Sequence, residues 1–264
     1  MPGEWGDTAE FYERSFGRLC EGSVDSVLDA VTSELGGHTA SLVDVGTGPG
    51  TLARAAASRG FAAFGCDPEP SMVALARLRS TDIDYQVAGL PNLPYPDRAF
   101  TAVCANFVVN HTHRPKDAVR ELARVSDGVV AVTIWPRVRT VLNGLWSGVV
   151  RDSAAVTAPG TVVPPEADFE RTDAGLTDLL AGAGLTEPWA STLDWDFAIA
   201  AHELWPAIEA GVGTIGTTYL AQNQDARDRM RSAYWARSAA LVASDGLMHF
   251  PTLALLGVAR RAVR

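Results

Sequence analysis

Residues 41–50 read SLVDVGTGPG, a short apolar run followed by a loop that contains three glycines. The apolar run favours a β-strand, since it is too short for a helix. Gly46, Gly48 and Gly50 permit positive φ angles and let a ligand approach the backbone where no Cβ stands in the way. Residues 51–57, TLARAAA, favour a helix whose first N–H groups are free donors. The stretch therefore predicts a strand, a tight loop and a helix.

A second apolar run, residues 61–66 (FAAFGC), ends at Asp67. At the carboxyl end of a parallel strand, a carboxylate can accept hydrogen bonds from both hydroxyls of a ribose. Asp44 would repel a pyrophosphate but suits a cationic ligand. The dinucleotide fingerprint requires Gly or Ala at the sixth position of the loop, where this chain has Thr51. These residues indicate a nucleotide-like cofactor that carries positive charge.

The chain resembles the class I S-adenosylmethionine-dependent methyltransferases between residues 43 and 135. Residues 43–50 resemble the first motif of that family, and residues 67–72 (DPEPSM) resemble its acidic ribose-binding motif. Residues 93–100 (LPYPDRAF) are similar to a signature of its small-molecule group, which includes the ubiquinone and menaquinone C-methylating enzymes. Residues 106–111 (NFVVNH) are similar to that group's segment after strand four. The motifs occur in the order and with the spacing of the family.

The resemblance implies S-adenosylmethionine as the cofactor, S-adenosylhomocysteine as its product, and a small-molecule acceptor. The cofactor-binding residues predicted from the pattern and the resemblance are Tyr12, Asp44, Gly46, Thr47, Gly48, Gly50, Asp67, Pro68, Met72, Gly89, Leu90, Asn106 and Phe107. The three cysteines lack metal-ligand spacing and no histidine cluster accompanies them, so we predict no metal.

One position departs from the family pattern. The family often has an acidic residue that contacts the adenine amino group, and Gly89 stands at that position in this chain. We therefore expect adenine to be held by backbone groups near Gly89 and Leu90 and by apolar packing. A hydrogen bond to a charged acceptor is worth roughly 1.5–3 kcal/mol, so the affinity should be lower than with the acid.

His111 is the only histidine that the resembled fold places near the transferred methyl group, and it is our predicted general base. A loop histidine that packs or caps is the alternative. Transfer from a sulfonium is an in-line displacement, so the protein mainly orients the reactants and excludes water. Tyr12 and Phe16 could close over the cofactor or belong to an apolar core helix, and His202 and Tyr219 could contact the acceptor.

The chain of 264 residues is 47% hydrophobic and 20% charged, as is ordinary for a globular protein. Its net charge of −9 argues against nucleic acid as a partner. The sequence has no run of 18 apolar residues and no secretory signal pattern, so we expect no membrane partner. The odd number of cysteines, with Cys66 and Cys104 in predicted core strands, indicates reduced thiols in a cytoplasm. We expect a monomer or homodimer.

Strands alternate with helices through the first half of the chain, which predicts an α/β fold with a doubly wound, mostly parallel sheet. The resemblance adds seven strands, an antiparallel edge strand and a helical cap. We predict one methyltransferase domain over residues 1–264. Within it we expect an N-terminal helical lid at residues 1–37 and a cofactor-binding core at residues 38–135. We expect cap insertions that bind the substrate at residues 136–185 and 200–245.

The expected strands cover residues 41–45, 62–66, 83–87, 102–105, 129–135, 192–199 and 248–259. The expected helices cover residues 11–34 (as one or two helices), 51–58, 71–78, 115–125, 137–150, 174–183, 203–210 and 226–243. Ser71 is the expected cap of the third of these helices. Residues 154–168 contain three prolines and are predicted to form a loop.

Six of the seven tryptophans lie from residue 135 onward, which suits either a pocket for a flat, hydrophobic acceptor or the core of the cap. The function that we favour is methyl transfer to an O, N or C atom of a mainly apolar small molecule in specialised metabolism. One alternative is a protein that keeps the cofactor site but acts as a cyclase, a decarboxylase or a binding module. Another is an NAD(P)-dependent oxidoreductase, against which Thr51 and residues 93–100 count.

Overall fold

The computed structural model describes residues 8–160 and 162–262. The described residues form two compact units. The sheet unit takes residues 20–137, 162–193 and 253–262, and the helical unit takes residues 8–19, 138–160 and 194–252. These units divide the chain at other residues than the predicted lid, core and cap, whose roles stay predictions.

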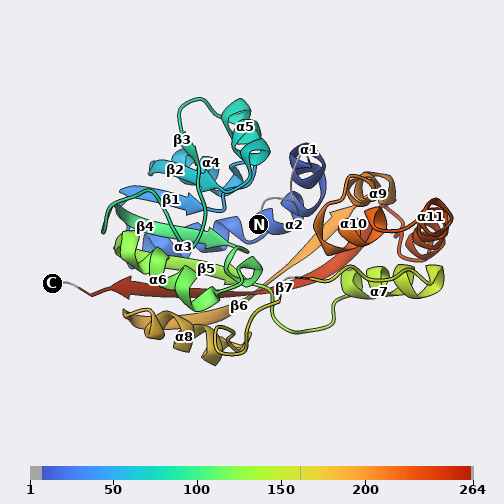
Figure 1. The fold of residues 1–264 in the computed structure, drawn as a ribbon. Helices are drawn as coiled ribbons and strands as arrows, with labels where there is room; N and C mark the ends of the chain where they lie inside the picture. Colours follow the sequence, from blue (N-terminus) through green and yellow to red (C-terminus); the bar gives the residue numbers. More distant parts are fainter. Residues whose placement is uncertain (1–7, 161, 263–264) are drawn as a thin grey trace. The chain divides into compact units, whose positions relative to one another are not determined.

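Within the described residues, seven strands form one sheet of order β3-β2-β1-β4-β5-β7-β6 (Figure 1). Neighbouring strands from β3 to β5 pair in parallel, whereas β7 pairs antiparallel with β5. The doubly wound, mostly parallel seven-stranded fold is therefore confirmed, with the antiparallel strand one position inside the edge. The strands are β1 Ser41–Val45, β2 Ala62–Asp67, β3 Asp84–Val87, β4 Phe100–Asn106, β5 Ser126–Ile134, β6 Leu185–Ile199 and β7 Met248–Arg261.

The helices of the sheet unit are α2 Arg18–Glu21 (which begins in the helical unit), α3 Val24–Glu34, α4 Thr51–Ser58, α5 Pro70–Arg79, α6 Pro115–Val125 and α8 Asp173–Gly182, with the 3-10 turn η2 Val109–His111. The helices of the helical unit are α1 Ala9–Tyr12, the π-helix η1 Glu13–Gly17, α7 Val141–Ser153, α9 Ala201–Glu209, α10 Gly213–Leu220 and α11 Gln224–Ala239.

The one or two helices predicted over residues 11–34 are two helical stretches, residues 9–21 and 24–34, divided by a turn at Gly22 and Ser23. Two other helices differ from the predictions. Helix α5 begins at Pro70 with Glu69 as its N-cap, so Ser71 is not the cap; proline suits the first helical position because its φ is preset. Helix α10 was not predicted, because its glycine- and threonine-rich sequence lacks helix formers.

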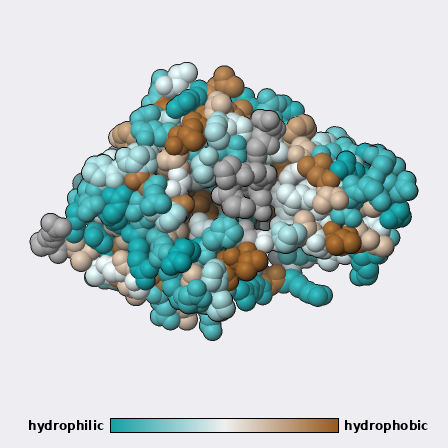
Figure 2. Space-filling view, viewed as in Figure 1, coloured by the Kyte–Doolittle hydropathy of each residue, from teal (hydrophilic) through white to brown (hydrophobic). Residues whose placement is uncertain are grey.

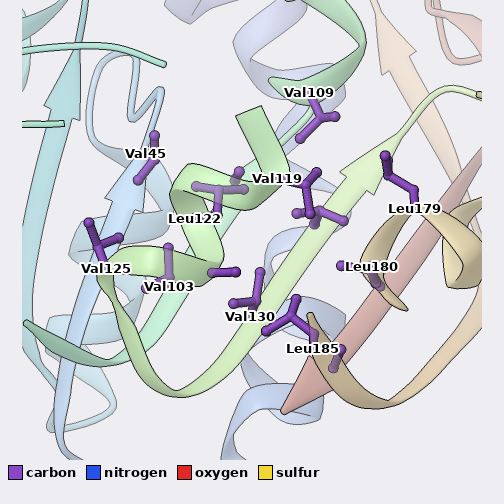
Figure 3. Packing of buried hydrophobic residues seen from close by; sticks show 14 of the residues in the cluster. Val45, Val103, Val109, Val119, Leu122, Val125, Val130, Leu179, Leu180 and Leu185 are labelled. Atoms are coloured by element: carbon purple, nitrogen blue, oxygen red, sulfur yellow. The ribbon is translucent and has the colours of Figure 1, made fainter. Parts of the chain in front are cut away.

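The central strands are buried on both faces, and alternate side chains enter different clusters. One cluster lies between the sheet and helices α6 and α8, and Figure 3 shows these side chains pointing toward one another. The other lies against helices α3 and α4. Val43, Val103 and Val130 belong to the first cluster, and their neighbours Leu42, Ala102 and Val129 belong to the second.

The segment LPYPDRAF is fastened to α6 by Arg124. Its guanidinium donates to the backbone oxygens of Leu93 and Tyr95, at 3.2 and 2.9 Å, and to Asp97 Oδ1 at 2.9 Å. Glu121, one turn earlier on α6, accepts from Arg124 and from the N–H of Leu93 at 2.7 Å. The motif that carries much of the family resemblance therefore has a structural role in this fold.

The core of the helical unit is aromatic. Trp205 lies 4.7 Å from Tyr234 and 5.5 Å from Tyr219, measured between ring centroids, and Trp146 stacks on Tyr234 at 5.6 Å. The Tyr234 hydroxyl donates to the carbonyl of Ala201 at 2.7 Å. Trp146 and Trp205 thus contribute to the packing of this unit, as the core alternative for the tryptophans expected.

The surface in Figure 2 is hydrophilic over most of the face shown, with separate hydrophobic patches. Exposed large apolar side chains include Leu78, Val156 and Val162. Across residues 8–160 and 162–262, no helix combines the length and the apolar character needed to cross a membrane.

Candidate functional site: the glycine loop and its carboxylates

The glycine loop follows β1 as predicted, and φ is +73° at Gly46, +52° at Gly48 and +85° at Gly50. Side chains with a Cβ rarely adopt this left-handed region. The loop is also closely surrounded. A Cβ on Gly46 would lie 2.4 Å from Cγ2 of Val108, and a Cβ on Gly50 would lie 2.5 Å from Oη of Tyr85. These glycines serve both the turn and the close packing.

Asp67 ends β2, and its carboxylate is bonded to the loop. Oδ2 accepts the N–H of Gly48 at 2.9 Å, and Oδ1 accepts the N–H of Glu69 at 2.9 Å. Burial raises the pKa of Asp67 to about 6, against the lowering effect of the two N–H donors. Each carboxylate oxygen can accept a further bond. Asp67 can therefore bind two hydroxyl groups while it holds the loop.

Asp44 lies in β1 and is only 1% exposed. Its Oδ2 accepts the hydroxyl of Thr47 at 2.7 Å. Burial raises the pKa of Asp44 to about 7; the bonds from Thr47 and from the backbone N–H of Ala53 lower it, and the charge of Asp67 raises it further. Asp44 is thus a buried carboxylate that is bonded to the glycine loop through Thr47.

The residues predicted for the adenine side lie in the loops after β2 and β3. The N–H of Ala88 donates to the backbone oxygen of Asp67 at 3.0 Å, which joins the two strand ends. A Cβ on Gly89 would lie 2.9 Å from Cβ of Pro68, so these two residues are neighbours. Leu90 is half-buried and packs against the cluster under α6. The space beside Gly89 is therefore limited by Pro68.

Met72 and Tyr12, two further residues predicted to bind the cofactor, lie in helices. Met72 is the third residue of α5 and is 3% exposed, so little of its side chain reaches the surface. Tyr12 lies in α1 and Phe16 in η1, both half-buried in the helical unit. The contacts of Met72 and Tyr12 with a cofactor stay predictions.

Phe107 directly follows β4 and has a φ of +60°. Its N–H donates to both the carbonyl oxygen and Oγ1 of Thr133, at 3.2 and 2.9 Å. Its ring stacks on Trp135, with the centroids 3.8 Å apart and the planes 14° from parallel. The carboxyl ends of β4 and β5 therefore carry an aromatic pair.

His111 ends the turn η2, is exposed, and donates its backbone N–H to the carbonyl of Val108 at 2.9 Å. Val108 in turn packs against Gly46. The structure therefore brings the turn that carries His111 against the glycine loop, as a base near the methyl group requires. His111 as the base stays a prediction.

Asn106, the last residue of β4, uses its side chain within the protein. Oδ1 accepts from Thr133 Oγ1 at 2.5 Å and from Ser23 Oγ at 2.8 Å, and Nδ2 donates to the carbonyl of Cys20 at 3.3 Å. The contact of Asn106 with the cofactor stays a prediction. Its amide is hydrogen-bonded to Thr133, Ser23 and the Cys20 carbonyl.

Sequence reasoning missed Tyr85, Ser23 and Thr133. Tyr85 is 1% exposed, and a Cβ on Gly65, its partner across β2 and β3, would lie 2.6 Å from its ring. Gly65 and Gly50 thus make room for the Tyr85 ring beneath the loop. A strand glycine opposite an aromatic residue is the signal that could have identified it. Ser23 and Thr133 carry no such signal.

The family described as "methyltransferase domain" matches residues 43–132 of this chain. This segment includes the glycine loop, Asp67, the LPYPDRAF segment and the turn after β4. Residues 43–132 therefore carry a methyltransferase domain. S-adenosylmethionine is the cofactor of this family.

Two curated relatives and one solved structure are similar to parts of this chain. The demethylmenaquinone methyltransferase of Paenarthrobacter aurescens (strain TC1) is 29% identical over 100 residues, 38% of this chain and 38% of the relative. The malonyl-[acyl-carrier protein] O-methyltransferase of Salmonella typhimurium (strain LT2) is 32% identical over 131 residues, 49% of this chain and 51% of the relative. The chain thus spans about half or less of the length of these relatives.

The solved structure is that of the YcgJ protein from Bacillus subtilis. It is 17% identical, with a TM-score of 0.54 over 91% of this chain and 99% of that protein. At this identity the likeness shows the fold alone, and it covers more of the chain than the matched segment does.

The residues around the loop fit S-adenosylmethionine chemically. The carboxylate of Asp67 keeps acceptor capacity for the two hydroxyl groups of a ribose, and the carboxylate of Asp44 suits the positive charge of an ammonium group. The three glycines of the loop hold positive φ angles and put no Cβ between a ligand and the backbone. Among residues 8–160 and 162–262, no three His, Cys, Asp or Glu side chains are grouped to hold a metal ion.

Proposed function

We propose that this chain transfers a methyl group from S-adenosylmethionine to an O, N or C atom of a mainly apolar small molecule in specialised metabolism. The observation that carries the proposal is the pair of buried carboxylates around the glycine loop. Asp67 is bonded to Gly48 of the loop, and Asp44 is bonded to Thr47 of the loop. A cofactor that combines a ribose with an ammonium group supplies donors to both.

The cofactor supplies a methyl group on a sulfonium, which is already activated for displacement. Asp67 orients the ribose, and Asp44 binds the cationic end of the cofactor. The glycine loop and the turn at residues 108–111 hold the reacting end and exclude water, which is the main catalytic contribution that an in-line displacement needs. His111 takes a proton from the acceptor atom when that atom is protonated.

The two curated relatives are named for different acceptors, demethylmenaquinone and malonyl-[acyl-carrier protein]. The stacked pair of Phe107 and Trp135 at the ends of β4 and β5 supports a flat, apolar acceptor. A panel of quinone-like, aromatic and polyketide-like compounds tests this, and transfer only to highly charged or macromolecular acceptors would contradict it.

The proposal includes a small-molecule acceptor, no nucleic-acid or membrane partner, a cytoplasmic location and a monomer or homodimer. The net charge of −9 supports the exclusion of nucleic acid. Cys66 and Cys104 are buried free thiols, which supports a reducing compartment. Sedimentation analysis of the purified protein measures the oligomeric state.

The decisive experiment is isothermal titration of the purified chain with S-adenosylhomocysteine, with NAD as the control. We expect micromolar binding of S-adenosylhomocysteine and none of NAD. Binding of NAD instead would favour an oxidoreductase. Binding of S-adenosylhomocysteine without formation of demethylated cofactor from any acceptor would favour a cyclase, a decarboxylase or a binding module on the same site.

A further inference from the structure

Phe107 adopts a backbone conformation that residues with a Cβ rarely adopt, with a φ of +60°. Such a residue persists only where its surroundings enforce the conformation. Here its N–H donates to the carbonyl oxygen and the hydroxyl of Thr133, at 3.2 and 2.9 Å. Thr133 is fully buried and lies opposite Asn106 in the register of β4 and β5. The hydroxyl of Thr133 in β5 thus fixes Phe107, which is the first residue after β4.

The Thr133 hydroxyl is itself held by a chain of polar groups. It donates to Asn106 Oδ1 at 2.5 Å, and Asn106 Nδ2 donates to the carbonyl of Cys20 at 3.3 Å. The buried hydroxyl of Ser23 lies 2.8 Å from Asn106 Oδ1 and 2.9 Å from the same carbonyl, so its one proton serves either acceptor. We call Phe107 N–H, Thr133, Asn106, Ser23 and the Cys20 carbonyl the hydroxyl–amide relay.

The conformation of Phe107 decides where the chain goes next. Val108 follows it directly and packs so closely on the glycine loop that a Cβ on Gly46 would lie 2.4 Å from Val108 Cγ2. His111 is bonded to Val108 through its backbone N–H at 2.9 Å. A change in φ at Phe107 would therefore move both the packing against Gly46 and the side chain of His111.

We propose that Thr133 and Asn106 are positioning residues for the site. The hydroxyl–amide relay holds Phe107 at positive φ and thereby sets the turn at residues 108–111 against the glycine loop. This inference rests on the proposed function, because the loop is the proposed binding site for the cofactor. It assigns Asn106 a role that acts through Phe107, and it adds Thr133 and Ser23 to the residues on which binding depends.

The first test compares Thr133→Val, which keeps the shape and removes the hydroxyl, with Thr133→Ser, which keeps the hydroxyl. We expect Thr133→Val to raise the Kd for S-adenosylhomocysteine tenfold or more, and Thr133→Ser to change it less than twofold. Ser126→Ala is the matched control, since Ser126 is a fully buried hydroxyl at the other end of β5. It should lower the melting temperature without changing the Kd more than twofold. Equal effects of Thr133→Val and Ser126→Ala on the Kd would overturn the proposal.

The second test examines the backbone argument directly. Glycine adopts positive φ without cost. In the Phe107→Gly background, Thr133→Val should therefore change the Kd less than threefold, although Phe107→Gly itself is expected to weaken binding. A loss of tenfold or more in that background would overturn the role of Thr133 in holding φ.

The third test needs no cofactor. Amide hydrogen exchange of residues 107–111 should accelerate at least tenfold in Thr133→Val and stay as in the wild type in Thr133→Ser. Unchanged protection in folded Thr133→Val would overturn the relay. Failure of the wild type to bind S-adenosylhomocysteine would overturn the proposed function alone, because the exchange result decides the relay in either case.

Discussion

The carboxylate of Asp67 accepts a hydrogen bond of 2.9 Å from the backbone N–H of Gly48, so the end of β2 fixes the loop that follows β1. A second backbone donor, Glu69, holds the other oxygen at the same distance. The residue proposed to bind the ribose thus also shapes the loop proposed to surround the cofactor. Changes at Asp67 should affect both.

Asp67→Asn keeps the size of the side chain but removes its charge and one acceptor. We expect the affinity for S-adenosylhomocysteine to fall by about 1.5–3 kcal/mol, the worth of a hydrogen bond to a charged group. Titration calorimetry measures the change. Asp82→Asn, at an exposed position before β3, is the control and should leave the affinity unchanged. Equal affinity of Asp67→Asn and the wild type would remove Asp67 from the site.

The affinity should also depend on pH. Burial raises the pKa of Asp44 to about 7 and that of Asp67 to about 6. The ammonium group of the cofactor favours the ionised carboxylates, so binding of S-adenosylhomocysteine, which keeps this group, should strengthen as the pH rises from 5.5 to 7.5 and then level off. Asp44→Asn should remove most of this dependence. Affinity that is constant or falls over this range would contradict the assignment of Asp44.

The stability of the protein without ligand should show the opposite trend. In the unfolded chain an aspartate titrates near pH 3.9, so between about pH 4 and 7 the folded state binds more protons at Asp44 and Asp67 than the unfolded state does. Their contribution to the free energy of unfolding therefore decreases as the pH rises through this window. Chemical denaturation of the wild type and Asp44→Asn at pH 5.5 and 8 measures the difference, which should be smaller in the variant.

Gly48→Val should abolish cofactor binding while the fold is retained, because the side chain would occupy the space of the ligand beside a backbone at φ +52°. Gly36→Val is the control for backbone strain, since Gly36 has a φ of +66° with nothing within 4 Å of an added Cβ. Calorimetry and the thermal midpoint separate the two effects. Normal binding by Gly48→Val would refute the loop as the cofactor site.

His111→Ala should lower kcat about 100-fold if His111 is the general base, with little change in cofactor affinity. His113→Ala, two residues on and also exposed, should leave kcat within twofold. Steady-state kinetics with an identified acceptor provides the measurement. A small effect of His111→Ala would show that orientation alone carries the rate.

Arg124→Met should destabilise the fold by about 1–3 kcal/mol, because it removes the guanidinium that donates to the carbonyls of Leu93 and Tyr95 and leaves Glu121 with only the Leu93 N–H as a donor. Arg120→Met is the control, since the Arg120 side chain is 57% exposed and pairs with Asp117 at the surface. Exposed pairs contribute about 0–1 kcal/mol. Equal stability of the two variants in urea denaturation would contradict the role of Arg124.

Local sequence predicted the first half of the fold closely. Strand β1, helix α4 and helix α6 have the predicted bounds, because their apolar spacing, glycines and prolines act within a few residues. The second half was less predictable. Strand β6 begins at Leu185, seven residues before the predicted start at 192, since its exposed alternating residues give a weak strand signal.

By itself, the sequence determined the type of site. The strand before Gly46, the glycines of the loop and an acid at the end of the next strand are local features, and each requires its residue type for steric or electrostatic reasons. The family resemblance rested on the same short segments, and the fold agreed with it.

Only the tertiary structure decided what surrounds that site. Asn106, Thr133 and Ser23 are far apart in the sequence, and any one of them alone is an ordinary polar residue. The register of β4 with β5 brings Asn106 opposite Thr133, and the packing of α3 on the sheet brings in Ser23. Buried polar groups need hydrogen-bond partners, and here the long-range packing supplies Thr133 and Ser23 as the partners of Asn106. A short sequence pattern contains no information about such pairings.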